Sequence, residues 1–192
     1  MYYIWEHDDF DFSNLFIVNI PENNPWQKYY FQYFNKMDVV PNEIPNVPFE
    51  LVTGRHNKKL IFNDYIFVPY LGFKLVNERL KKVLDELEIN NLQFFPVIIK
   101  YRSLKKYING YYIMNCCNYI SSIDLENSIY QKNMKGSLYN FKRLILNESN
   151  IPNDTKLFMP ENTNIYIIHE NLKNLFEKER ISGIKFIQID NK

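Results

Sequence analysis

The chain carries one helix–strand pattern twice. Residues 77–97 read NERLKKVLDELEINNLQFFPV, and residues 169–189 read HENLKNLFEKERISGIKFIQI. In the first copy, apolar residues from Val76 to Leu87 fall at i, i+4, i+7, i+8 and i+11, which is the spacing of one helix face. A run rich in Phe, Val and Ile follows and predicts a strand. Because an amphipathic helix must bury its apolar face, each copy predicts a helix packed on a sheet.

The pattern predicts helices near residues 77–88 and 169–180. Asn77 is a good N-cap for the first helix, whereas His169, at the equivalent position of the second, is a weaker one. Two asparagines that tolerate left-handed backbone follow the first helix, so we expect it to stop near Glu88. We interpret the copies as two equivalent helix–strand units. Chance reuse of a common α/β pattern is the alternative.

Most of the remaining chain is typical of strands and loops. Residues 21–48 contain five prolines, so we expect residues 1–60 to form an irregular N-terminal part and residues 61–192 to form the core. No Gly- or Ser-rich linker divides the sequence. We therefore predict a single compact α+β domain over residues 1–192, with a mainly antiparallel or mixed sheet. The other strand candidates are residues 2–5, 15–20, 62–68, 107–115, 118–124, 140–146, 156–159 and 165–168.

The charge of the chain is balanced, with 23 Lys and Arg against 22 Asp and Glu. This balance argues against a general nucleic-acid binder, because such proteins usually carry a basic excess. No apolar run approaches the roughly 20 residues that cross a bilayer, and the first residues lack the pattern of a secretory signal. The adjacent Cys116 and Cys117 suit buried small side chains better than a disulfide framework. We therefore expect a cytoplasmic protein that binds neither membrane nor nucleic acid.

Residues suited to catalysis or metal binding are scattered. The histidines His7, His56 and His169 lie far apart, and none has a second His or Cys at metal-ligand spacing. The His-Asp-Asp run that begins at His7 could supply ligands, but neighbours on a strand face opposite sides, which favours an exposed acidic turn. The chain lacks a GxSxG elbow and a glycine-rich phosphate loop. We expect no metal, no cofactor and no enzymatic activity; a hydrolase whose carboxylates meet in the fold is the alternative.

An acidic stretch near the N-terminus is the candidate contact for a protein partner. Acids beside large flat side chains suit a basic partner, because charge steers the encounter and aromatic rings supply buried area. The alternative, which the pattern favours, is a strand edge whose aromatic residues lie in the core while its acids are solvated. The residues assigned to the contact are Trp5, Glu6, Asp8, Asp9 and Asp11.

Several motifs of the chain stand in the order found in one bacterial family. They are Phe62-Asn63-Asp64-Tyr65-Ile66, the 77–97 stretch with its Phe-x-Pro close, Tyr112-Ile113-Met114-Asn115, residues 120–125 ending in an Asp-aliphatic pair with Ser128 shortly after, and residues 169–186 with a Gly-aliphatic-x-Phe strand. In this order they resemble family eleven of the polymorphic-toxin immunity proteins, long catalogued as a domain of unknown function. The resemblance runs from about residue 60 to the end and is weaker in the N-terminal third. Asn77 and His169 stand where that family often has Ser.

The resemblance implies a small cytoplasmic protein that is encoded beside a toxin and protects the producing cell by binding it. The mechanism would be stoichiometric occlusion of the toxin, and the family supplies no catalytic motif to carry over. The acidic stretch would then face a basic toxin surface. An interaction module without a toxin is a further alternative, and the sequence leaves the oligomeric state open.

Overall fold

The chain forms two compact units, which the computed structural model describes at residues 1–8, 16–17, 26, 48–53, 62–68, 73–89, 92–101 and 105–189. Unit 1 comprises Met1–Glu6 and Asn118–Lys192, and unit 2 comprises His7–Cys117. Each unit combines an α-helix with a β-sheet, which confirms the predicted α+β class. The expectation of a single domain over residues 1–192 stays a prediction.

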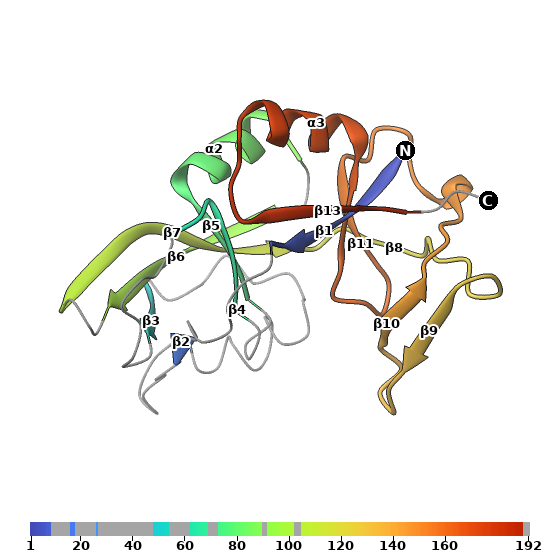
Figure 1. The fold of residues 1–192 in the computed structure, drawn as a ribbon, viewed down its shortest axis with the longest axis horizontal. Coiled ribbons are helices and arrows are strands. Elements are labelled where there is room, and N and C mark those ends of the chain that lie inside the picture. The colour runs from blue at the N-terminus through green and yellow to red at the C-terminus, as the bar shows by residue number, and fades with distance from the viewer. Residues whose placement is uncertain are drawn as a thin grey trace. The chain divides into compact units, whose positions relative to one another are not determined.

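The sheet of unit 2 has the strand order β2-β3-β6-β7-β5-β4. Strands β3 and β6 are parallel, and the other neighbours are antiparallel. Helix α2, Glu78–Glu86, follows β5 directly (Figure 1). The strands are β2 Phe16–Ile17, β3 Phe49–Thr53, β4 Tyr65–Val68, β5 Phe73–Asn77, β6 Leu92–Tyr101 and β7 Lys106–Cys116.

The two faces of this sheet are covered by different parts of the unit. Phe95 and Ile113 belong to a buried apolar cluster on one face. Successive residues on a strand point to opposite faces, so Phe94 and Tyr112 face the other way. There the ammonium of Lys81, on α2, lies over both rings, 5.0 Å from the first and 5.6 Å from the second. Helix α2 therefore covers the face opposite this cluster.

The main sheet of unit 1 has the strand order β13-β1-β12-β11-β8, so a strand from the N-terminus lies inside a sheet built from the end of the chain. Figure 1 shows β1, in blue, beside β13, in red. Helix α3, Glu170–Lys178, follows β12. The strands are β1 Tyr2–His7, β8 Tyr119–Ile120, β11 Leu157–Pro160, β12 Tyr166–His169 and β13 Ile184–Gln188, and the pair β9 Ile129–Lys132 and β10 Leu138–Arg143 forms a separate hairpin.

Unit 1 is layered around this sheet. On one face the ring of Trp5, on β1, contacts Phe176 of α3 edge to face, with their centres 5.2 Å apart. On the other face Tyr2 and Phe158 pack in a cluster that includes residues after the hairpin, such as Leu144. Strand β1 therefore contributes side chains to the core on both faces of the sheet. Burying these side chains holds the start of the chain against the C-terminal part.

The two units contain the same structural module. In unit 2 it runs β4, β5, α2, β6, β7, and in unit 1 it runs β11, β12, α3, β13, with β1 in the place of β7. On β5, Val76 pairs with Tyr112 of β7; on β12, Ile168 pairs with Tyr3 of β1. The predicted equivalence of the two helix–strand units is therefore confirmed. The fourth strand of the second module comes from the opposite end of the chain.

The N-termini of the two helices are capped as the sequence predicts, but their C-termini differ from the predicted ones. The side chain of Asn77 accepts a hydrogen bond from Leu80 N at 2.9 Å, and Nδ1 of His169 accepts one from Asn171 N at 3.3 Å. The helices stop at Glu86 and Lys178, and the left-handed residue follows two positions later, at Glu88 with φ 49° and at Arg180 with φ 52°. The two asparagines expected to end the first helix lie outside the described residues.

Some strands of the structure differ from the predicted ones. Residues 1–60 were expected to be irregular, but they contain strand β3, which pairs with β2 and with β6 from a later part of the chain. The candidate at residues 118–124 is reduced to β8, Tyr119–Ile120, with an isolated bridge at Ile123. Strand β9 was missed, because its apolar residues do not alternate in a regular pattern.

Candidate functional site

The polar residues at the start of α2 form one connected cluster in unit 2. Asp64 is buried, with 6% of its surface exposed. Its carboxylate accepts hydrogen bonds from Asn77 Nδ2 at 2.7 Å and from Arg79 at 3.1 Å. Beside it, the hydroxyl of Tyr111 donates to the carbonyl of Asn63 at 2.7 Å. Burial, together with the negative charge of Asp64, raises the pKa of Tyr111 far above its ordinary value.

This cluster holds the start of the helix. The carboxylate of Asp64 is bonded on both oxygens, and the backbone carbonyl of the same residue accepts from Asn77 N at 2.8 Å. These hydrogen bonds and the ion pair with Arg79 orient the carboxylate toward the start of the helix. The Asp-containing motif of the sequence therefore positions α2.

Among the described residues of unit 2 is a buried lysine with a lowered pKa. Lys74, on β5, is 5% exposed and pairs across the sheet with Met114 and Phe67. Desolvation lowers the pKa of its ammonium to about 8, against a smaller opposing effect of Cys116. An amine with such a pKa is suited to catalysis, but the burial of Lys74 shields it from a substrate.

The predicted acidic contact is only partly within the described residues. Trp5 is 3% exposed and packs against Tyr166 and Phe176, so it lies in the core of unit 1. Glu6 is half-buried and Asp8 is exposed. The core position of Trp5 agrees with the alternative interpretation, although β1 lies between β13 and β12 and is not a strand edge. The predicted contacts Asp9 and Asp11 lie outside the described residues.

The structure shows what surrounds the histidines and cysteines that the sequence singled out. His169 caps α3, and the ring of His7 lies 5.2 Å from the ring of Phe67; His56 lies outside the described residues. Cys116 is buried, as expected, and Cys117 is half-buried. The described residues contain no group of His, Cys, Asp and Glu that could hold a metal ion. None of the helices in the described ranges is long and apolar enough to cross a membrane.

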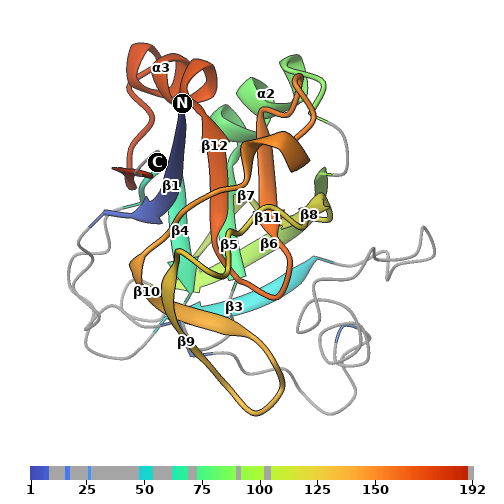
Figure 2. The ribbon, with the colours of Figure 1, turned by 90° about the vertical axis from the view of Figure 1, so that its right-hand side faces the viewer.

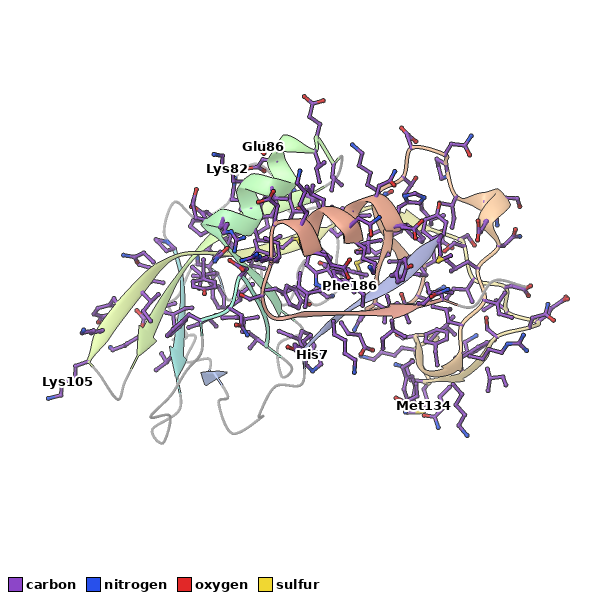
Figure 3. All side chains as sticks on the ribbon, turned by 45° about the horizontal axis from the view of Figure 1, so that its top comes forward. His7, Lys82, Glu86, Lys105, Met134 and Phe186 are labelled. Atoms are coloured by element: carbon purple, nitrogen blue, oxygen red, sulfur yellow. The ribbon has the colours of Figure 1, made fainter. Side chains whose placement is uncertain are left out.

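The surface that the sequence analysis missed is the β9–β10 hairpin of unit 1. Its apolar residues Ile129, Met134 and Tyr139 are 54%, 106% and 45% exposed. Figure 3 shows Met134 at the far end of the hairpin. Residues 127–147 contain four basic residues and no acidic one, a local excess that the balanced total charge conceals. That local composition is the signal that would have identified this surface.

The comparison with protein families covers most of both units. Residues 20–191 match the Immunity protein family (Imm11). A search of curated proteins returns no match. The match spans the Asp64 cluster, both helices and the hairpin, and it agrees with the order of motifs in the sequence. This chain belongs to the Imm11 family of immunity proteins.

Proposed function

We propose that the protein binds and neutralises a cognate bacterial toxin by stoichiometric occlusion. The observation that carries this proposal is membership of the Imm11 family over residues 20–191. The polar groups described above support it, because Asp64, the most buried carboxylate among the described residues, has a structural role and Lys74 is enclosed in the sheet. A binding protein needs a surface, and this chain offers exposed apolar and charged side chains outside its cores.

The toxin would be encoded near this gene, and the complex would form in the cytoplasm of the producing cell. A standard interface buries about 1,600 Å² in total, which a chain of 192 residues can supply without further domains. Within such an interface a few apolar anchors carry most of the binding energy. The acidic stretch, with Glu6, Asp8, Asp9 and Asp11, remains one proposed contact; Trp5 would serve it by fixing β1 in the core.

The test is a titration of toxin activity by purified immunity protein. A stoichiometric inhibitor abolishes activity at one equivalent, whereas an enzyme that destroys or modifies the toxin does so at a small fraction of an equivalent. We expect a break at equimolar protein, co-purification in one complex, and rescue of growth on co-expression with the neighbouring toxin gene. Inactivation at substoichiometric protein would replace occlusion by catalysis, and full toxicity at excess protein would refute the proposal.

A further inference from the structure

We propose that the β9–β10 hairpin of unit 1 is the element that binds the partner toxin, and that it fits an acidic, concave surface of that toxin. This inference rests on the proposed function and deepens it, because it names the contact and the chemistry of the surface contacted. Three observations support this inference: the hydrogen-bonded turn of the hairpin, its exposed apolar side chains and its positive charge.

The turn of the hairpin is held in one shape. The side-chain oxygen of Asn133 accepts hydrogen bonds from the backbone of Lys135 and of Ser137, both at 2.9 Å. Gly136 has φ 89°, a conformation that favours glycine, and its N–H donates to the carbonyl of Asn133 at 3.0 Å. Met134 therefore stands at the tip of a preorganised turn, and binding through it costs little ordering of the backbone.

The base of the hairpin is anchored in the core of unit 1. Ser128 is buried; its hydroxyl accepts from Ile145 N at 3.0 Å and donates to the carbonyl of the same residue at 3.3 Å. The ring of Tyr130 lies 5.9 Å from that of Phe141, which packs against the core cluster. One face of the hairpin thus packs against the core of unit 1. The exposed residues of the hairpin are not needed to hold it in this position.

The opposite face presents apolar side chains to solvent. In the pairing of the two strands Gln131 lies opposite Tyr139, and Ile129 lies opposite Arg143. Directly opposed residues share a face, so Ile129 and Tyr139 lie together on the side away from Tyr130. Together with Met134 at the tip, they give the hairpin three large exposed apolar residues, of the kinds that serve as anchors in protein interfaces.

The charge of the hairpin selects the partner surface. Lys132, Lys135, Lys142 and Arg143 are all exposed, and no acidic residue lies between positions 127 and 147. Attraction between opposite charges speeds association and excludes partners of like charge. A projecting, basic arm with an apolar tip is complementary to an acidic depression with an apolar floor. For an immunity protein, occupying such a cleft would block the toxin's access to its substrate.

The hairpin is also outside the architecture that the two units share. Neither strand belongs to the module of four strands and one helix that recurs in both units. Figure 2 shows the hairpin as an orange loop that leaves the strands of unit 1. A group of exposed apolar residues on an element outside this shared module is typical of an external contact.

The experiment measures how tightly two hairpin variants bind the purified toxin of the neighbouring gene. The toxin is inactivated by a change in its active site. One variant combines Lys132→Glu and Lys135→Glu; the other combines Met134→Ser and Tyr139→Ser. The matched control combines Lys105→Glu and Lys106→Glu, which makes the same charge change on the exposed arm of β6 and β7 in unit 2 (Figure 3). Thermal unfolding of each variant verifies that the fold is retained, and a Met134→Leu variant serves as the conservative replacement.

We expect each hairpin variant to weaken toxin binding at least tenfold, the control to stay within about twofold, and Met134→Leu to retain affinity. Charge reversal should act mainly on the association rate and lose its effect at high salt. Equal losses in the control would reduce the effect to overall charge and overturn the inference. Unchanged affinity with intact growth rescue would overturn it while leaving the proposed function in place; no binding by the unaltered protein would refute both. Hairpin-dependent binding to a defined RNA or DNA duplex without toxin binding would replace the protein partner by a nucleic acid.

Discussion

The ammonium of Lys173 lies 5.2 Å from the centre of the Tyr3 ring, which joins the last helix of the chain to its first strand. The hydroxyl of Tyr3 in turn donates to Glu170, at the start of the same helix, at 3.5 Å. Unit 2 repeats the arrangement within a continuous segment, where Lys81 lies over Tyr112 and the hydroxyl of Tyr112 donates to Glu78. The same interaction therefore fastens helix to sheet in both modules.

Replacing these lysines should weaken both units to a similar degree. Lys81 and Lys173 are mostly buried over aromatic rings, with side-chain exposures of 25% and 19%, so a change of either one to Gln should lower the free energy of unfolding by about 0.5–1 kcal/mol. Lys82→Gln is the control, since its side chain is 77% exposed and pairs loosely with Glu86 at 3.8 Å (Figure 3). Urea titration measures all three, and an equal loss in the control would refute the assigned role.

Glycine at the helix ends should stabilise the protein. Glu88 and Arg180 have positive φ, a conformation that costs a residue with a Cβ atom roughly 1 kcal/mol, so Glu88→Gly and Arg180→Gly should each raise the free energy of unfolding by up to that amount. The control Glu86→Gly lies in helical backbone and should lower it by about 1 kcal/mol. Denaturant unfolding that gave the same sign at positions 86 and 88 would contradict the prediction.

Lys74 should make stability rise with pH above neutrality. Its pKa is about 8 in the folded protein and 10.5 when unperturbed, so between these values the unfolded chain binds more protons than the folded one. Stability then increases as pH rises through this window, by roughly 2 kcal/mol by pH 9.5, while below pH 8 the cost of burying the charge is present in full. Chemical denaturation between pH 7 and pH 9.5 measures the slope.

The Lys74→Met variant provides the control for this slope. It removes the buried charge while keeping an unbranched side chain, so its unfolding free energy should stay flat over the same pH range. Tyr111 does not produce the effect, because its raised pKa acts in the opposite direction and only as the unfolded tyrosine titrates near pH 10. A slope that persists in Lys74→Met would assign the pH dependence to another group.

Reversing the acidic stretch tests the contact predicted from the sequence. If Asp8, Asp9 and Asp11 meet a basic toxin surface, changing all three to Lys should lower the association rate at low salt by tenfold or more, with a smaller effect at high salt. Surface plasmon resonance with the inactivated toxin measures the rate. An unchanged rate, alongside losses in the hairpin variants, would place the contact on β9–β10 alone.

The sequence by itself determined the repeated helix–strand units. Their apolar spacing, the cap at Asn77 and the following β-branched and aromatic run are local signals, and local backbone preference decides each of them. The same kind of signal predicted the burial of Cys116 and, through the strand alternative, the core position of Trp5. In both cases side-chain character was enough.

Only the tertiary structure decided what depends on residues that are distant in sequence. The position of β1 beside β12, the partners of Asp64 and the exposure of Met134 follow from strand pairing and packing across the chain. No periodicity along the sequence encodes such pairings, because a strand's register and the face it buries are set by its neighbours in space. The proposed contact surface depends on both: its basic excess can be read from the sequence, but only the fold shows that Ile129, Met134 and Tyr139 are exposed.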